Sequence, residues 1–199
     1  MRRRAAYGSE SEPAERARPI GAAPWRHHAG EAVNADGGTS TTPPSLERVV
    51  LHGEALTRLS PLLEADRAQA VADLEAENRF VPLGVKAGAN GPFVLRLSIQ
   101  EGRLVFDIRD PRDEPVTAVV LALGPFRGLI KDYQLLVESH LKAVEEGREQ
   151  RIQAIDMGRR GLHNEGAALL MERLNGKAEM DHETARRLFT LVCVLHQRI

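Results

Sequence analysis

The chain has 199 residues, of which 27 are basic and 28 acidic, and its formal charge at pH 7 is -1. This length allows one sizeable hydrophobic core with a flexible arm and disfavours two full domains. The near-neutral charge argues against a protein whose whole surface clamps nucleic acid, because that affinity comes from neutralising phosphates with Lys and Arg. A single cysteine, Cys193, excludes an intrachain disulfide, so the composition fits a reducing compartment.

The sequence contains no run of the roughly 18 consecutive apolar residues that a membrane-spanning helix requires. Its most apolar stretch, residues 188–195, is far shorter. Three arginines at positions 2–4 imitate the basic start of a signal peptide, but charges and prolines interrupt residues 5–20. We therefore expect a cytoplasmic protein without membrane association.

Residues 1–45 are rich in Ala, Gly, Pro, Ser, Thr and Arg and lack a sustained period of 2 or 3.6. A segment of this composition buries too little apolar surface to offset the entropy of ordering. The sequence thus predicts a disordered N-terminal arm over residues 1–45 and a single domain over residues 46–199.

The first ordered elements are expected to be a short strand from Leu46 and a helix from Pro61. β-Branched residues precede the turn residue Gly53, and Ser60 followed by proline is typical of a helix N-cap. Asn78 is the expected end of that helix. Five acidic residues predict a solvated face on it: Glu64, Asp66, Asp73, Glu75 and Glu77.

From residue 93 to residue 123 the apolar period changes to two, which predicts three strands. Their short turns, at 101–102 and 110–115, allow only antiparallel neighbours, so the strands form a meander. One face of this sheet is apolar and requires a cover of helices. The predicted fold class is α+β, with a three-stranded antiparallel meander and a short N-terminal strand packed against three to four helices.

Helical spacing predicts those covering helices near residues 125–147, over residues 149–174, and after the N-cap Asp181. Gly158, Gly161 and Gly166 each cost about 1 kcal/mol inside the second of these helices. Either that helix breaks there or another element packs very close. Residues 188–195 are apolar on nearly every side, which indicates the central core or a homodimer seam.

The segment DMGRRGLHNEG, residues 156–166, holds the candidate functional site. If the helix is unbroken, Asp156, Arg159, Arg160 and His163 share neighbouring surface, with Asp156 able to pair with Arg160. Two arginines beside a histidine suit phosphate or carboxylate, because the guanidinium binds such oxyanions bidentately and imidazole exchanges a proton near neutral pH. The predicted anion- or partner-binding set is Asp156, Arg159, Arg160, His163, Asn164 and Glu165. The competing interpretation is a solvated, ion-paired helix face.

Other chemistries find less support in the sequence. No HExxH spacing and no cysteine pair occurs, so we predict neither a metal site nor a cofactor. Cys193 has His196 three residues later, but a cysteine in so apolar a run is typical of an inert core residue.

The same undecapeptide resembles a family of small uncharacterised alphaproteobacterial proteins, UPF0262. Further resemblance lies in LSP at 59–61, PFR at 125–127, KDY at 131–133 and TARRLFTL at 184–191. It thus covers nearly the whole chain after residue 45 and excludes the arm. The family offers no established activity or cofactor that the resemblance could carry over to this chain.

The leading functional hypothesis is a cytosolic, non-catalytic binding or adaptor domain, with an Arg/His helix face for an anionic ligand or protein partner. One alternative is a small hydrolase or phosphoryl-transfer enzyme with His163 as acid-base, Arg159 and Arg160 as oxyanion clamps and Asp156 as orienter. Another is RNA association through the arginine-bearing arm and helix face.

Overall fold

A computed structural model of the chain describes residues 44–85 and 91–196. The strands are β1 (Leu46–His52), β2 (Phe80–Pro82), β3 (Phe93–Gln100), β4 (Arg103–Arg109), β5 (Pro115–Ala122) and β6 (Ala178–Met180). The helices are α1 (Pro61–Ala76), α2 (Arg127–Glu145), α3 (Glu149–Leu174) and α4 (His182–Leu195), with 3-10 turns η1 (Glu54–Arg58) and η2 (Gly124–Phe126). The fold class is α+β, as the sequence predicts.

The main sheet has four strands in the order β1-β3-β4-β5, and it is mixed rather than purely antiparallel. Strands β3, β4 and β5 run antiparallel, and the two-residue turn between β3 and β4 has positive φ at both Glu101 and Gly102. The backbone twist of such a turn matches that of the strands it joins. Side chains on one face of these strands are almost fully buried: Leu95, Leu97, Leu104, Phe106, Ile108, Val119 and Leu121.

The sequence predicts three strands in this sheet and a short N-terminal strand besides. That N-terminal strand, β1, is the fourth member of the sheet and pairs parallel to β3. A parallel pair needs a long crossover, and the segment that contains α1 supplies one. Asn78, just past α1, fixes the end of β1: its amide nitrogen donates to Leu46 O (2.8 Å) and its Oδ1 accepts from Leu46 N (2.7 Å). The strands β2 and β6 pair antiparallel in a separate sheet, and with three residues each they are too short to show alternation.

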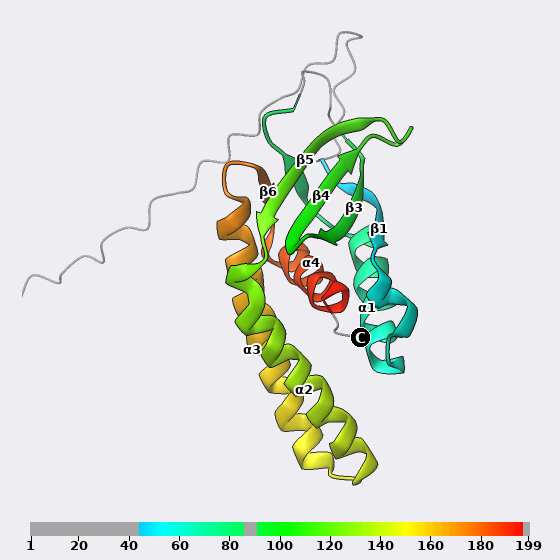
Figure 1. The fold of residues 1–199 in the computed structure, drawn as a ribbon, viewed down its shortest axis with the longest axis vertical. Helices are drawn as coiled ribbons and strands as arrows, with labels where there is room; N and C mark the ends of the chain where they lie inside the picture. The colour runs from blue at the N-terminus through cyan, green and yellow to red at the C-terminus, as the bar shows by residue number, and fades with distance from the viewer. Residues whose placement is uncertain (1–43, 86–90, 197–199) are drawn as a thin grey trace, which may run out of the picture. The chain divides into compact units, whose positions relative to one another are not determined.

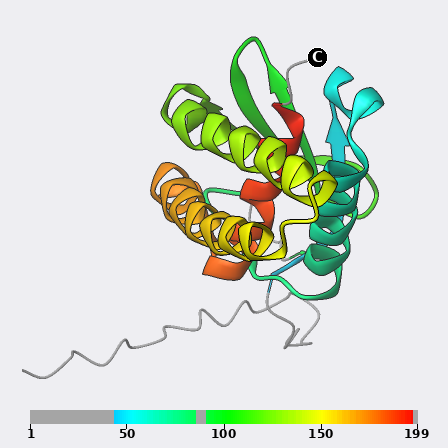
Figure 2. The same ribbon diagram turned by 90° about the horizontal axis from the view of Figure 1, so that it is seen from below.

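Helix α4 lies in the middle of the helical layer, below the main sheet in Figure 1. Viewed from below, α4 is surrounded by α1 on one side and by the antiparallel pair α2 and α3 on the other (Figure 2). Each residue from 188 to 195 is at most 8% exposed. Of the two roles predicted for this run, the structure therefore assigns it to the core and leaves no exposed seam on it for a second subunit.

Helix α3 continues through its three glycines without a break. At Gly166 the reason is close packing, since a Cβ placed there would lie 2.3 Å from two ring carbons of Phe189 on α4. No atom lies within 4 Å of the corresponding position at Gly161. One glycine of the three is thus required by the contact between α3 and α4.

Two further expectations need correction. Pro44 and Ser45, assigned to the arm, already accept backbone hydrogen bonds from Phe80 and Phe93; residues 1–43 lie outside the described residues. The acidic side of α1 is not uniformly solvated, because Glu75 Oε1 accepts the backbone N–H of Val49 at 3.0 Å. Among the described helices, none is long and apolar enough to cross a bilayer.

Candidate functional site

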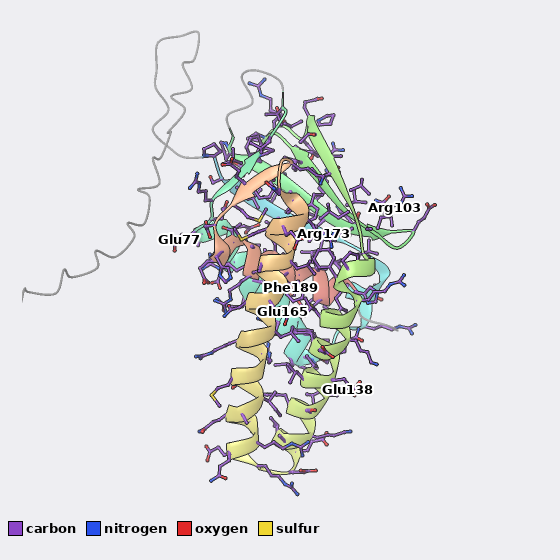
Figure 3. The ribbon with its side chains drawn as sticks, turned by 90° about the vertical axis from the view of Figure 1, so that its left-hand side faces the viewer. Glu77, Arg103, Glu138, Glu165, Arg173 and Phe189 are labelled. Atoms are coloured by element: carbon purple, nitrogen blue, oxygen red, sulfur yellow. The ribbon has the colours of Figure 1, made fainter. Side chains whose placement is uncertain are left out.

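The path of α3 separates the predicted site residues onto two sides of the helix. Arg159 and His163, four residues apart, face α1, α2 and α4, where their contacts lie. Arg160, Asn164 and Glu165 are exposed. Figure 3 shows the α2–α3 pair from the side, with Glu165 labelled on α3 and Phe189 on α4. The six residues therefore do not share one cationic face.

Arg159 is neutralised inside the protein by Asp66 on α1. Its terminal nitrogen lies 2.6 Å from Asp66 Oδ2, and the two side chains are only 16% and 18% exposed. The same oxygen accepts the hydroxyl of Tyr133 on α2 at 2.7 Å. Asp156, expected beside Arg160, instead lies 4.0 Å from Arg159 Nη1. We call Asp66, Tyr133 and Arg159 the Asp66 network.

The Asp66 network shifts the pKa of two of its members. Burial works against the charge of Arg159, but Asp66 overcomes this and raises the pKa of the guanidinium. Burial, assisted by the charge of Asp66 and its hydrogen bond, raises the pKa of Tyr133 above its usual range. Arg159 is therefore charged and Tyr133 protonated at neutral pH, and neither group is available for proton transfer.

His163 packs against the Asp66 network and lies mostly out of water. Its ring stacks on Tyr133 with centroids 5.5 Å apart and meets the edge of Phe189 at 6.3 Å. Burial, followed by the charges of Arg159 and Arg186, lowers the pKa of His163 to about 4. The imidazole is thus neutral at pH 7, and its Nε2 atom is buried without a hydrogen-bond partner.

A cleft of about 240 Å³ lies beside His163. It is lined by Asp66, Gln69, Ala70 and Asp73 of α1, His163 of α3, and Glu183, Arg186, Arg187 and Thr190 of α4. Of the other lining residues, Arg186 also has a buried and unpartnered Nε atom. A buried polar group without a partner costs about 1–3 kcal/mol, so two such nitrogens on the lining of one cleft need an explanation.

The surroundings of His163 disfavour acid-base catalysis near neutral pH by the predicted residues. A general acid or base works best with a pKa near the operating pH, and that of His163 is far below it. Neither Asp156 nor Arg160 lines the cleft with His163, so the predicted catalytic set is not assembled. Cys193 is fully buried, and burial raises the pKa of its thiol. In residues 44–85 and 91–196, no three His, Cys, Asp or Glu side chains gather closely enough to hold a metal ion.

Comparison with known proteins places the chain in a family. The model of an uncharacterised protein family, UPF0262, matches residues 44–198. The chain belongs to the UPF0262 family. UPF0262 proteins of Granulibacter bethesdensis and Acidiphilium cryptum are 69% and 61% identical to it over 159 and 153 residues, which are 77% of this chain in both cases and 90% and 93% of theirs. A Rhodospirillum rubrum relative is 55% identical over 141 residues, 71% of this chain and 85% of its own.

No solved structure matches this UPF0262 protein. The family description assigns no reaction, ligand or partner. Its function must therefore be argued from the cleft and the groups around it.

Sequence reasoning missed Asp66 and did not connect Tyr133 with the site. The signal for Asp66 was available, because it lies three residues after Leu63 and four before Ala70, both buried on α1. That spacing places the carboxylate on the apolar side of the helix rather than on the solvated side. Tyr133 likewise lies on the buried side of α2, between Ile130 and Val137.

The buried imidazole predicts a pH dependence of stability in this UPF0262 protein. The pKa of His163 is about 4 in the folded state against an ordinary 6.5, so the unfolded chain binds more protons between these values. Stability from this group is therefore complete above pH 6.5 and falls as the pH drops towards 4, by at most about 3 kcal/mol. Urea unfolding at several pH values should give a flatter profile for His163→Gln than for the wild type. Parallel profiles would contradict a buried, neutral imidazole.

Proposed function

We propose that this UPF0262 protein is a non-catalytic binding domain whose cleft between α1, α3 and α4 receives an anionic group of a protein partner. The observation that carries the proposal is the pair of unpartnered buried nitrogens on residues that line the cleft, those of His163 and Arg186. An acceptor oxygen entering the cleft gives the Arg186 Nε–H a partner, and also the His163 Nε2 in the tautomer that carries its proton there, and it recovers the free energy lost by burying these groups.

Arg186, rather than Arg159, is the cation that binds the anionic group of the partner. Arg159 is held by the Asp66 carboxylate, which is only 18% exposed, whereas Arg186 pairs with Glu183, whose side chain is 58% exposed. Exposed ion pairs contribute little, so a carboxylate or phosphate oxygen displaces Glu183 at small cost. A guanidinium with its Nε free binds such a group bidentately. Arg187 adds a second charge at the rim, 3.9 Å from Asp73.

The size of the cleft decides between an enclosed small molecule and an inserted group. Pockets that enclose a drug-sized ligand have volumes of about 300–1,000 Å³, and this cleft is smaller. It has room for one acidic side chain or one phosphoryl group. A group of that size, presented by a larger molecule, is how an adaptor domain recognises a partner.

The experiment is an NMR titration of the labelled full chain with acetate and with inorganic phosphate at constant ionic strength. Saturable shifts are expected for the His163 ring and for the amides of residues 186–190, with Arg186→Gln weakening binding by about tenfold or more. Arg160→Gln is the matched control, because Arg160 is exposed on α3 outside the cleft and its loss should leave binding unchanged.

Two results would contradict the proposal. Shifts that grow linearly without saturation would mean that the cleft holds no anion site. Equal weakening by Arg186→Gln and Arg160→Gln would mean that only the general charge of the surface matters. No observation in residues 44–85 and 91–196 favours the hydrolase or the RNA alternative, so we propose neither.

A further inference from the structure

The two edges of the main sheet differ in whether side chains bind their outward-facing backbone groups. At the β1 edge, side chains that follow or belong to α1 bind the outward backbone groups: Asn78 bonds Leu46 on both its N–H and its C=O, and Glu75 accepts the N–H of Val49. β1 also carries the charged residues Glu47 and Arg48. Capping of this kind and charge on an edge strand both prevent another strand from adding there.

The opposite edge, β5, has neither side-chain capping nor charged residues. Within the described ranges, β5 pairs only with β4, and no side chain hydrogen-bonds its backbone on the other side. Its eight residues, PVTAVVLA, include no charge, and Val120 is 49% exposed. A long uncharged edge of this kind is a template for pairing with another strand.

We propose that β5 is the interface at which a second copy of this chain adds, antiparallel, about a two-fold axis through Val119. The two four-stranded sheets then form one continuous sheet. This proposal is independent of the proposed function, because no residue of β5 lines the cleft.

The sequence of β5 is complementary to itself in this register. With Val119 on the axis, half-buried Thr117 and buried Leu121 lie opposite each other, so the helix-facing sides of both sheets become continuous. Exposed Ala118 and Val120 are opposite each other on the outer face, where pairing covers Val120. Aligned apolar cross-strand pairs stabilise a sheet.

Neighbouring registers fit less well. A shift that places the axis between two residues pairs helix-facing with outward-facing side chains, which the buried face forbids. An axis through Ala118 brings Pro115, which has no N–H to donate, opposite Leu121. The register about Val119 pairs residues 116–122, which include neither proline nor charge.

The test is the mass of the full chain by light scattering across the micromolar range. The wild type is expected at twice the 21.9 kDa of one chain. Ala118→Lys with Val120→Lys places like charges opposite each other and should raise the dimer dissociation constant by about tenfold or more. Val144→Lys, at a position 53% exposed on α2, is the matched control and should remain dimeric.

A variant with opposite charges at positions 118 and 120 tests the register. Ala118→Glu with Val120→Lys sets opposite charges across the axis twice and should restore the dimer, whereas an axis through Ala118 would set the carboxylates against each other. Hydrogen exchange of the β5 amides in the wild type should slow as protein concentration rises. A monomeric wild type, a dimer that both lysines leave intact, or exchange independent of concentration would overturn the proposal.

Discussion

Replacing Gly166 by alanine is expected to destabilise the protein by about 2 kcal/mol or more, although alanine favours a helix by about 1 kcal/mol over glycine. The added Cβ would lie 2.3 Å from the Cδ1 and Cε1 atoms of Phe189. Phe189 is fully buried on α4, so its ring has no free space into which to move. Chemical denaturation of the variant and the wild type measures the difference.

Gly161→Ala is the control with the opposite expected sign. The same methyl group meets no atom within 4 Å there, so helix propensity alone should stabilise the protein by up to about 1 kcal/mol. If both alanine substitutions change the stability equally, α3 does not approach Phe189 as closely as described.

A double-mutant cycle locates the cause of the Gly166 effect. In a Phe189→Leu background the smaller side chain leaves room for the methyl group, so Gly166→Ala should cost about 1 kcal/mol less than in the wild type. Additive effects would assign the loss to the glycine backbone and not to the ring.

Substitution Asp66→Asn is expected to cost about 3 kcal/mol, because it leaves the mostly buried guanidinium of Arg159 without its counter-charge. The amide oxygen still accepts the hydroxyl of Tyr133, so the loss reports charge rather than shape. Thermal and urea unfolding measure it.

Glu64→Gln is the matched control on the same helix. Its partner Arg67 and Glu64 itself are 32% and 49% exposed, and such pairs contribute about 0.5 kcal/mol or less. Arg159→Met added to Asp66→Asn should restore part of the stability, since it removes the uncompensated charge. A double variant less stable than Asp66→Asn alone would show that Arg159 contributes mainly through packing.

The two proposals are separable because the cleft and the β5 edge share no residue. The Arg186→Gln and Arg160→Gln variants leave β5 untouched, and the substitutions at positions 118 and 120 leave the cleft untouched. A dimer without anion binding, or anion binding by a monomer, would therefore remove one proposal and keep the other.

The elements of the fold could be predicted because their signals are local. Ser60 accepts from Leu63 N at the start of α1, and Asp181 Oδ1 from Thr184 N at the start of α4, as their cap positions indicate. Alternation gives β3, β4 and β5, and helical spacing gives α3 with its bounds. Of the six residues predicted for the site, only His163 lines the cleft, whose other residues lie on α1 and α4.

The tertiary structure decides which side chains contact one another. Helical periodicity puts Arg159 and Arg160 side by side, but only the packing of α3 on α1 gives one of them a buried carboxylate and leaves the other in water. The parallel pairing of β1 with β3 also depends on contacts between segments far apart in the chain. This pairing leaves β5 as the uncapped edge of the sheet. The sequence by itself determined each element and its apolar side, because these follow from neighbours within a few residues. Ion pairs and strand pairing join residues far apart in the chain. These interactions form only once the hydrophobic core has brought the residues together.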